Sequence, residues 1–261
     1  MDHIKPVIFC IAKLEHRYLE EFCKYHLSIG FDRIYIYDNE DEPTYQNLLS
    51  HIDNLYIVHY PGKSQQYTIL DDFRKNLMHH DNITHVINID CDEFIVLKHH
   101  NNIKDFINDY IKDDCAAIGI NWRFFGDSGR GNYTNEPLMT RFTMCQAHGD
   151  QHIKTLFNKE HFTSFRCMHC ITVRDGYHTK CTNGTIIDGP WNPNIDIGVI
   201  QINHYKTKTL EEFRHIRQRG FADSHDIESP ERVLESFNAH NINEVEDLTA
   251  FNYYNNFLAN R

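Results

Sequence analysis

Two aspartates stand two positions apart in Asp90-Cys91-Asp92, directly after the apolar segment 85–89. A carboxylate at the buried end of a strand is costly unless it is paired or bound to a metal. A hard cation such as Mg²⁺ or Mn²⁺ relieves the repulsion between two such groups and can bridge to diphosphate oxygens. An Asp-x-Asp tripeptide also occurs in solvated turns, so the metal-site interpretation depends largely on the strand that precedes the tripeptide.

Other polar residues can complete such a site. His204 follows the apolar segment 198–202, and imidazole is a good ligand for Mn²⁺; the alternative is a structural histidine among the 19 in the chain. Lys208 and Arg219 can neutralise the charge that a leaving diphosphate gathers, or they can be cations on the surface of a helix. Asp38 can accept hydrogen bonds from a nucleobase or ribose, or it can begin a turn.

A single displacement that transfers a group to a hydroxyl needs a carboxylate within hydrogen-bond reach of that hydroxyl. Asp127 is the first choice because it lies in a glycine-flanked loop, although it can also serve only to form that turn. Trp122 can stack against a sugar or fill the core. The full set of candidates for the base is Glu93, Asp127, Asp150 and Asp223.

A second group of metal-ligand types gives a rival interpretation as a zinc site. The spacing Cys-Met-His-Cys is too tight for a standard zinc knuckle, and no second Cys-x-x-Cys follows. The eight cysteines are scattered, and we expect most to be small buried apolar residues that need not pair. The possible zinc ligands are Cys167, His169, Cys170, His178 and Cys181.

The segments that must position these residues alternate between strand and helix patterns. Tyr18, Phe22, Tyr25 and Ile29 share one helical face, and Gly30 can end that helix. The β-α-β order predicts a mostly parallel twisted sheet with helices on both faces, which binds ligands at the carboxyl ends of its strands. The expected strands are 7–12, 33–37, 55–58 and 85–89, and further helices are expected near 48–52 and 69–78.

The second half is less regular. Strands are expected at 116–122 and 198–202, and helices are expected from Thr209, which has capping-box spacing to Glu212, and from Ser229. The tail 245–258 also has a helical pattern. With no repeat or linker, the 261 residues predict one domain. Within it we expect a nucleotide-sugar half (1–97), an acceptor and metal half (98–228) and C-terminal helices (229–261).

Composition narrows the class of partner. Lysine and arginine total 26 against 37 acidic residues, a net charge of −11 that disfavours binding to nucleic acid. No apolar run approaches the ~18 residues of a membrane span. The first expected strand begins at residue 7, and no signal-peptide pattern is expected before it. We therefore expect a cytoplasmic protein, bacterial or viral.

Several motifs, in order, resemble those of glycosyltransferases related to families 2 and 92. Asp90-Cys91-Asp92-Glu93-Phe94 resembles their DxDEF element, and Ala12-Lys13-Leu14-Glu15 resembles the start of their opening motif. The matching set spans residues 7 to about 223. Its other members are 36–39, 121–126 with Ser128-Gly129, Arg141-Phe142, Lys154-Thr155, and 202–205 with Lys208 and Arg219-Gly220.

The resemblance implies a GT-A fold and a metal-dependent transfer of a hexose. The donor would be a nucleotide-diphosphate sugar, a UDP-sugar by preference, the acceptor a glycan or other hydroxyl, the cofactor Mn²⁺ or Mg²⁺, and the stereochemistry inverting. Asp92 would be the principal metal ligand, Asp90 would contact the ribose or the metal, and His204 would complete the metal site. The residues implied around the nucleotide and its diphosphate are Ala12, Lys13, Glu15, Asp38, Asp90, Asp92, Lys208 and Arg219.

Three departures from the family pattern bear on this hypothesis. Leu14 replaces the usual asparagine of the opening motif, which removes a polar contact near the nucleotide. Asp127 and Arg130 stand where serine or asparagine and histidine are common, which leaves the acceptor undefined. The alternatives are a degenerate GT-A module that binds glycans or proteins, and a nucleotidyltransferase, which would usually carry a glycine-rich phosphate loop near residues 12–15.

Overall fold

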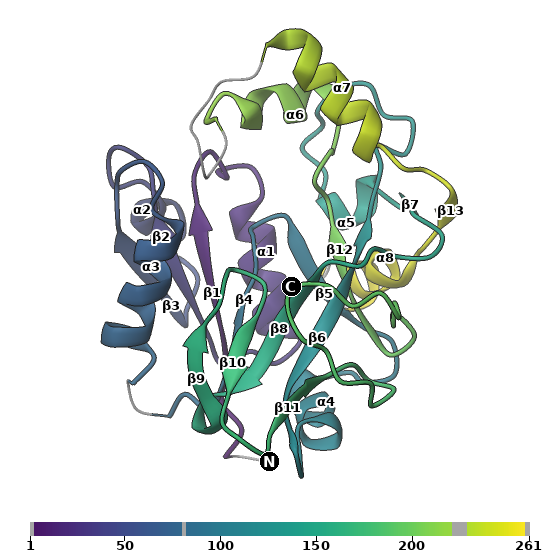
Figure 1. Cartoon of the computed structure of the whole chain (residues 1–261). Coiled ribbons are helices and arrows are strands. Elements are labelled where there is room, and N and C mark those ends of the chain that lie inside the picture. The colour runs from purple at the N-terminus through teal and green to yellow at the C-terminus, as the bar shows by residue number, and fades with distance from the viewer. Residues whose placement is uncertain (1–2, 80–81, 221–228, 259–261) are drawn as a thin grey trace.

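The computed structural model describes residues 3–79, 82–220 and 229–258. In this part of the chain a nine-stranded sheet runs in the order β3-β2-β1-β4-β8-β6-β12-β5, with β11 paired to β6 (Figure 1). Its strands are β1 (Pro6–Ala12), β2 (Arg33–Asp38), β3 (Leu55–His59), β4 (His85–Asn88), β5 (Glu93–Leu97), β6 (Cys115–Phe124), β8 (Ile153–Asn158), β11 (His178–Lys180) and β12 (Ile200–His204).

The sheet is mostly parallel. Strands β1, β2, β3 and β4 pair in parallel, as do β6 with β12 and β6 with β11. Strand β8 is antiparallel to both β4 and β6, and β5 is antiparallel to β12. The predicted α/β class, with a mostly parallel sheet flanked by helices, is confirmed, and one continuous sheet joins the two predicted halves.

The helices lie around this sheet (Figure 1). Two small strand pairs, β9 (Phe162–Phe165) with β10 (Ile171–Val173) and β7 (Met144–Cys145) with β13 (Val245–Glu246), lie outside it. The helices are α1 (Leu19–Ser28), α2 (Tyr45–Leu48), α3 (Gln66–Asp72) with the π-turn η1 (Phe73–Leu77), α4 (Ile103–Tyr110), α5 (Leu138–Arg141), the 3₁₀ turn η2 (Lys159–His161), α6 (Leu210–Arg217), α7 (Pro230–His240), and α8 (Thr249–Tyr253) with the π-turn η3 (Tyr254–Leu258).

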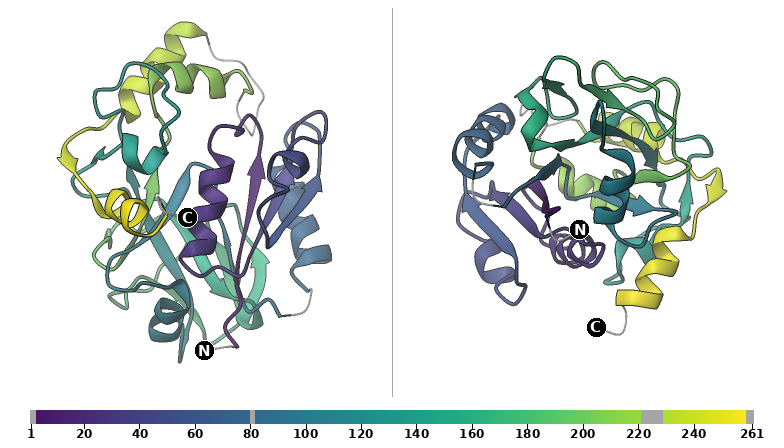
Figure 2. Two further views of the ribbon diagram at one scale, coloured as in Figure 1. Left: turned by 180° about the vertical axis from the view of Figure 1, so that it is seen from behind. Right: turned by 90° about the horizontal axis from the view of Figure 1, so that it is seen from below.

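Alternation along β1 builds a separate core on each face of the sheet. Ile8 and Cys10 pack in the cluster that includes the buried face of α1. Val7 and Phe9 point the other way, where Phe9 stacks on Phe73 with ring centroids 4.2 Å apart. The two faces are therefore covered by α1 and by α3 with η1 (Figure 2).

The capping signals are confirmed. The Thr209 side chain accepts from the Glu212 backbone N–H while the Glu212 carboxylate accepts from that of Thr209. Ser229 caps α7, with Pro230 in its first turn. Gly30 follows α1 with φ +102°, a left-handed conformation that favours glycine.

Two helix predictions need correction. The helix predicted near 48–52 is instead α2 at Tyr45–Leu48, because Asp38 accepts from the first N–H groups of that turn, and Leu48 at its end is 37% exposed. The tail does not begin as a helix at 245, because Val245 and Glu246 pair with β7.

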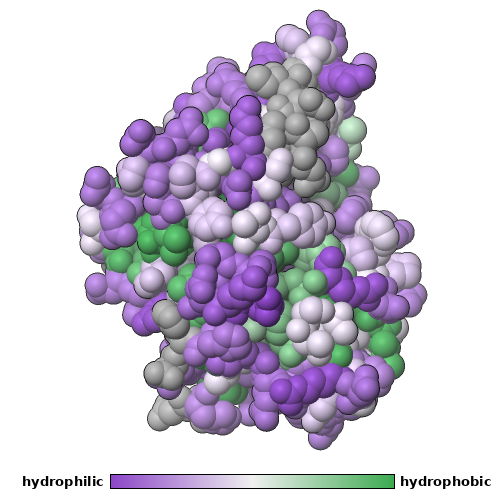
Figure 3. Space-filling view, turned by 60° about the vertical axis from the view of Figure 1, so that its left-hand side comes forward, coloured by the Kyte–Doolittle hydropathy of each residue, from purple (hydrophilic) through white to green (hydrophobic). Residues whose placement is uncertain are grey.

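Helices α6 and α7 lie above the carboxyl end of β1, at the end of the molecule opposite the N-terminus (Figure 1). On the face shown in Figure 3, hydrophilic side chains cover much of the surface and hydrophobic ones gather in separate patches. Within the residues that the structure describes, no helix has the length and apolar character needed to cross a membrane.

Gly119, in the middle of β6, tests how tightly this sheet is packed. A Cβ at this position would lie 2.7 Å from Cδ1 of Ile153 and 2.8 Å from Cδ1 of Ile187. We expect Gly119→Ala to lower the free energy of unfolding by about 1–3 kcal/mol through overpacking. Gly131→Ala, where a Cβ would meet no atom within 4 Å, should change it by less than about 0.5 kcal/mol. Urea denaturation of both variants measures this, and equal midpoints would contradict it.

Candidate active site

The antiparallel pairing of β5 with β12 brings His204 to the Asp90–Asp92 turn. His204 is in register with Glu93, the first residue of β5, and the backbone N–H of Tyr205 donates to the Asp92 carbonyl over 2.9 Å. Asp92 Oδ1 and His204 Nε2 consequently lie 3.6 Å apart. The structure thus brings together two of the three predicted metal ligands from segments 112 positions apart in sequence.

The expectation of an uncompensated anionic pair needs correction, because each aspartate has its own lysine. Lys154 Nζ donates to Asp90 Oδ2 over 3.1 Å, and Lys208 Nζ donates to Asp92 Oδ2 over 3.4 Å. Burial by itself would raise the pKa of both carboxyls, but these cations outweigh it and hold both pKa values below their ordinary range. Both aspartates are therefore charged without a metal.

His204 is in the form that can bind a cation. Burial lowers its pKa to about 3, so the imidazole is neutral at pH 7. Its ring packs against Trp122, with centroids 4.4 Å apart, and its buried Nδ1 has no hydrogen-bond partner among the described residues. Trp122 is itself buried and is part of the hydrophobic core.

The described residues contain no group of three or more His, Cys, Asp or Glu side chains placed to hold a metal. A cation between Asp92 and His204 would therefore have two protein ligands and would take its remaining ligands from water or phosphate. Mg²⁺ is commonly bound in this way, through one or two carboxylates and substrate phosphates. The donor set fits a metal that arrives together with a diphosphate.

Lys154 and Glu93 form the floor of the turn. Lys154 is fully buried and its Nζ lies 3.5 Å from Glu93 Oε2, which also accepts from the Asp90 backbone N–H over 3.0 Å. Burial raises the pKa of Glu93 well above its ordinary value. Glu93 lies beneath the turn with no exposed surface, so an acceptor hydroxyl cannot reach it.

Sequence reasoning gave Lys154 no role. The available signal was a lysine between the apolar residues Ile153 and Leu156-Phe157, where a buried cation needs an acidic partner.

Arg219 binds the opening motif (residues 12–15), which lies at the end of β1. Its Nη1 donates to the Lys13 carbonyl over 2.8 Å and to Glu15 Oε1 over 2.9 Å. Burial raises the pKa of Glu15, while the charge of Arg219 opposes this rise. Ala12 accepts from the Asn39 backbone N–H over 2.9 Å, and Leu14 lies at φ +60°, where asparagine is tolerated better than leucine.

The buried Asp38 side chain accepts hydrogen bonds from backbone N–H groups. Its Oδ2 accepts from the N–H groups of Thr44 (2.7 Å) and Tyr45 (3.0 Å), and its Oδ1 accepts from that of Glu40 (3.1 Å). This geometry supports the turn-forming alternative for Asp38.

The preferred base, Asp127, is held within its own loop. Its Oδ1 accepts from the Gly129 N–H over 2.9 Å and from Asn243 Nδ2 over 3.2 Å, while its N–H donates to Asn241 Oδ1 over 2.7 Å. The loop is thereby fixed to the segment that follows α7. Asp223 lies outside the described residues.

Asp150 makes a pair with His152 that the sequence did not reveal. Asp150 Oδ1 and His152 Nδ1 lie 2.6 Å apart, and the His152 side chain is 42% exposed. Two backbone hydrogen bonds hold the His152 ring beside the Trp122 ring. The Asp150 N–H donates to the Trp122 carbonyl, and the Trp122 N–H donates to the His152 carbonyl. The His152 ring stacks on Trp122 at 4.9 Å and 22°, and the exposed Trp191 lies 6.1 Å from it.

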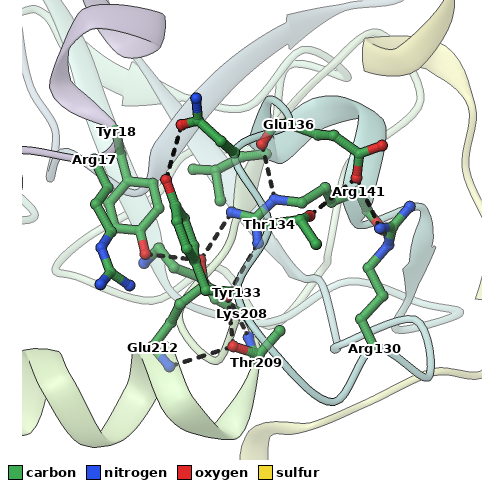
Figure 4. Close-up of polar contacts among 12 residues, drawn as sticks. Arg17, Tyr18, Arg130, Tyr133, Thr134, Glu136, Arg141, Lys208, Thr209 and Glu212 are labelled. Carbon is green, nitrogen blue, oxygen red and sulfur yellow. Dashed lines mark hydrogen bonds and ion pairs between the residues drawn. The ribbon is translucent and has the colours of Figure 1, made fainter.

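Glu212, at the start of α6, ties the loop that carries Lys208 to the rest of the fold (Figure 4). The guanidinium of Arg141 donates to both of its oxygens (2.8 and 3.0 Å), Tyr18 Oη donates over 2.8 Å and Thr209 Oγ1 over 2.6 Å. Lys208 Nζ lies 4.9 Å from the centre of the Tyr18 ring. Lys208 is therefore a buried residue of the site and not a cation on a helix surface.

The residues of the zinc alternative do not converge. Cys167 and Cys170 are adjacent, but Cys181 Sγ donates to Asn183 Oδ1, and His178 lies in β11. All eight cysteines are free thiols, as expected, and seven are buried.

Comparison with known proteins decides the family. Residues 5–237 match the sequence model of glycosyltransferase family 92. The chain belongs to glycosyltransferase family 92. This family 92 chain is 25% identical over 222 residues to a family 92 protein of Ricinus communis and 26% identical over 204 residues to one of Oryza sativa subsp. japonica.

These alignments cover 80% and 76% of the family 92 chain but only 37% and 32% of the two plant proteins. The chain thus spans about a third of the length of the curated relatives it matches. Among solved structures, S. aureus TarS (residues 1–349) aligns with 99% of this chain and 74% of its own, at 12% identity and a TM-score of 0.39.

The Arg141–Glu212 pair gives a test of what holds the site together. Arg141→Met should lower the free energy of unfolding by about 3–5 kcal/mol, because it leaves a buried carboxylate without its cation. The double variant Arg141→Met/Glu212→Gln should be more stable than the sum of the single losses predicts, by about 1 kcal/mol or more. Urea denaturation of the full cycle measures this.

Arg74→Met is the matched control for Arg141→Met, because Arg74 pairs with Asp71 at the surface and should contribute less than about 1 kcal/mol. The Arg130 position is unsuitable, because Arg130 Nε donates to the Arg141 carbonyl. Additive single losses, or equal effects at Arg74 and Arg141, would contradict the assignment.

Proposed function

We propose that this family 92 chain transfers a hexose from a uridine-diphosphate sugar to a glycan or other hydroxyl acceptor, with Mn²⁺ or Mg²⁺ and with inversion. The observation that carries the proposal is the approach of the Asp92 carboxylate and the neutral His204 imidazole at the carboxyl end of the sheet. Ligands of parallel α/β sheets bind at this edge. The matching family supports glycosyl transfer as the reaction class.

In this proposal Asp92 and His204 hold the cation, and the half-exposed Asp90 contacts the ribose or the metal. The cation supplies Lewis-acid stabilisation of the departing diphosphate. Lys208 is released from Asp92 when the cation binds there, and it can then face a phosphate oxygen. Arg219 keeps the 12–15 segment in place against the nucleotide through its bonds to Lys13 and Glu15.

We propose His152 as the base that receives the acceptor proton. Asp150 occupies its Nδ1, so Nε2 is the nitrogen left to accept from a hydroxyl. Its ring lies against Trp122, which in turn contacts His204, so the imidazole borders the proposed metal site. The exposed Trp191 beside it offers a face on which an acceptor sugar can stack.

The first test uses binding. Because two protein ligands are too few for a tight metal site, Mn²⁺ alone and UDP alone should each shift the melting temperature little. Together they should raise it by about 5 °C or more at saturating concentrations. Asp92→Asn and His204→Ala should remove the joint shift, measured by thermal denaturation with and without EDTA.

Asp71→Asn is the control, because Asp71 is exposed on α3 and pairs only with its neighbours Arg74 and Lys75. Full retention of the joint shift in both site variants would refute the metal assignment. A joint shift without turnover of any UDP-sugar would favour the binding-module alternative.

The second test uses turnover. His152→Ala should lower kcat with an acceptor by about 10²–10⁴-fold, while KM for the donor changes little, because the lost group acts on the acceptor. Asp150→Asn should lower kcat less, since it only misorients the ring. His148→Ala, at a nearby exposed histidine, should be neutral. If Asp127→Ala abolishes turnover and His152→Ala does not, the base is Asp127.

A further inference from the structure

Cys167 and Cys170 lie at the turn between β9 and β10, and the proposed transfer reaction has no role for them. The backbone N–H groups of Arg166 and Cys167 donate to the Cys170 carbonyl over 3.0 and 3.2 Å, which closes the turn. This brings the two Sγ atoms to 3.4 Å from each other. Both residues are free thiols in a Cys-x-x-Cys arrangement.

The two thiols have unequal surroundings. The two thiols are hydrogen-bonded to each other through their sulfurs, and the His169 backbone N–H donates to Cys167 Sγ over 3.4 Å. Led by the Cys170 hydrogen bond, these contacts lower the pKa of Cys167 to about 5, while the pKa of Cys170 is raised. Cys167 is half-buried and the other seven cysteines are buried, so the thiolate is formed where a reagent can reach it.

We propose that Cys167 and Cys170 are a reversible dithiol–disulfide site that reacts with a small disulfide of the glutathione type. The Cys167 thiolate attacks one sulfur of glutathione disulfide, which forms a mixed disulfide and releases one glutathione thiolate. Cys170 then loses its proton to that thiolate and attacks Cys167 Sγ, which releases the second glutathione. The protein pair loses two electrons, and glutathione disulfide is reduced to one thiol and one thiolate, which takes its proton from water.

The turn is connected to the proposed active site through His169. The His169 carbonyl accepts from Thr155 Oγ1 over 2.7 Å, and its Nδ1 lies 2.9 Å from the Ile153 carbonyl. Lys154, the partner of Asp90, lies between these two anchors, and the His169 ring packs 5.2 Å from Trp122. A sulfur–sulfur bond would replace the thiolate that accepts from the His169 N–H, and this change should reach Trp122.

Thiol chemistry tests the site without reference to glycosyl transfer. On the folded chain at pH 6, iodoacetamide followed by peptide mass spectrometry should label Cys167 first. Cys170→Ala should slow this labelling about tenfold or more, because it removes the hydrogen-bond donor that favours the Cys167 thiolate. In glutathione disulfide the wild type should form the Cys167–Cys170 bond, and Cys170→Ser should stop at the glutathione adduct of Cys167.

Cys181→Ser is the matched control, and it should leave both the labelling and the disulfide unchanged. Labelling of Cys167 no faster than that of the buried cysteines, or no disulfide in the folded chain, would overturn the proposal. An effect of this disulfide on glycosyl transfer would rest on the proposed function. The labelling and disulfide measurements do not depend on it, so the dithiol proposal and the proposed function can fail separately.

Fluorescence tests the connection to the active site. Trp122 and Trp191 are the two tryptophans of the sequence, so Trp191→Phe leaves Trp122 as the reporter. Oxidation should change its emission, and a reducing agent should restore it. His169→Ala should abolish the change while the disulfide still forms; an unchanged emission in Trp191→Phe would refute the connection.

Discussion

The hydrogen bonds and ion pair of the buried Glu212 carboxylate are the interactions on which the arrangement of α5, α6 and the start of α1 depends. The Glu212 side chain caps its own helix, binds the Arg141 guanidinium through both oxygens and accepts a hydrogen bond from the Tyr18 hydroxyl. These groups come from α6, α5 and the residue before α1, and burial makes any missing partner expensive. Lys208 is therefore held beside Asp92 by a network of buried side chains.

Charge compensation below that network explains how the Asp90–Asp92 turn can be built before any ligand arrives. Lys154 approaches from β8 and Lys208 from the loop before α6, so the half-exposed Asp90 carboxylate and the largely buried Asp92 carboxylate both stay ionised. In the proposed function a divalent cation at Asp92 would compete with Lys208, which pairs with the same carboxylate. The phosphates of a nucleotide-sugar donor would then be partners for that ammonium.

The parallel half of the sheet was predictable because buried parallel strands read as continuous apolar runs, as at 7–12 and 85–89. Strand β8 was missed because Lys154 breaks its apolar pattern, although this lysine is the group that makes the turn stable. Thr209 and Glu212 were found as a capping box, but their contacts with Arg141 and Tyr18 join residues up to 194 positions apart, which local spacing cannot reveal. The same holds for the stacking of His152 on Trp122, which lies 30 positions earlier in the sequence.

Leu14 shows how a departure in sequence can leave a site intact. Its backbone keeps the left-handed conformation that asparagine tolerates, at a cost of about 1–2 kcal/mol for a residue of its type. The conformation persists because the Leu14 N–H donates to Glu40, the next residue's N–H donates to Tyr45, and Arg219 holds the carbonyl before it. What the substitution removes is a side-chain contact, while the backbone that would face a nucleotide keeps its shape. A family member with leucine here can therefore retain the donor site and differ in how tightly the donor is held.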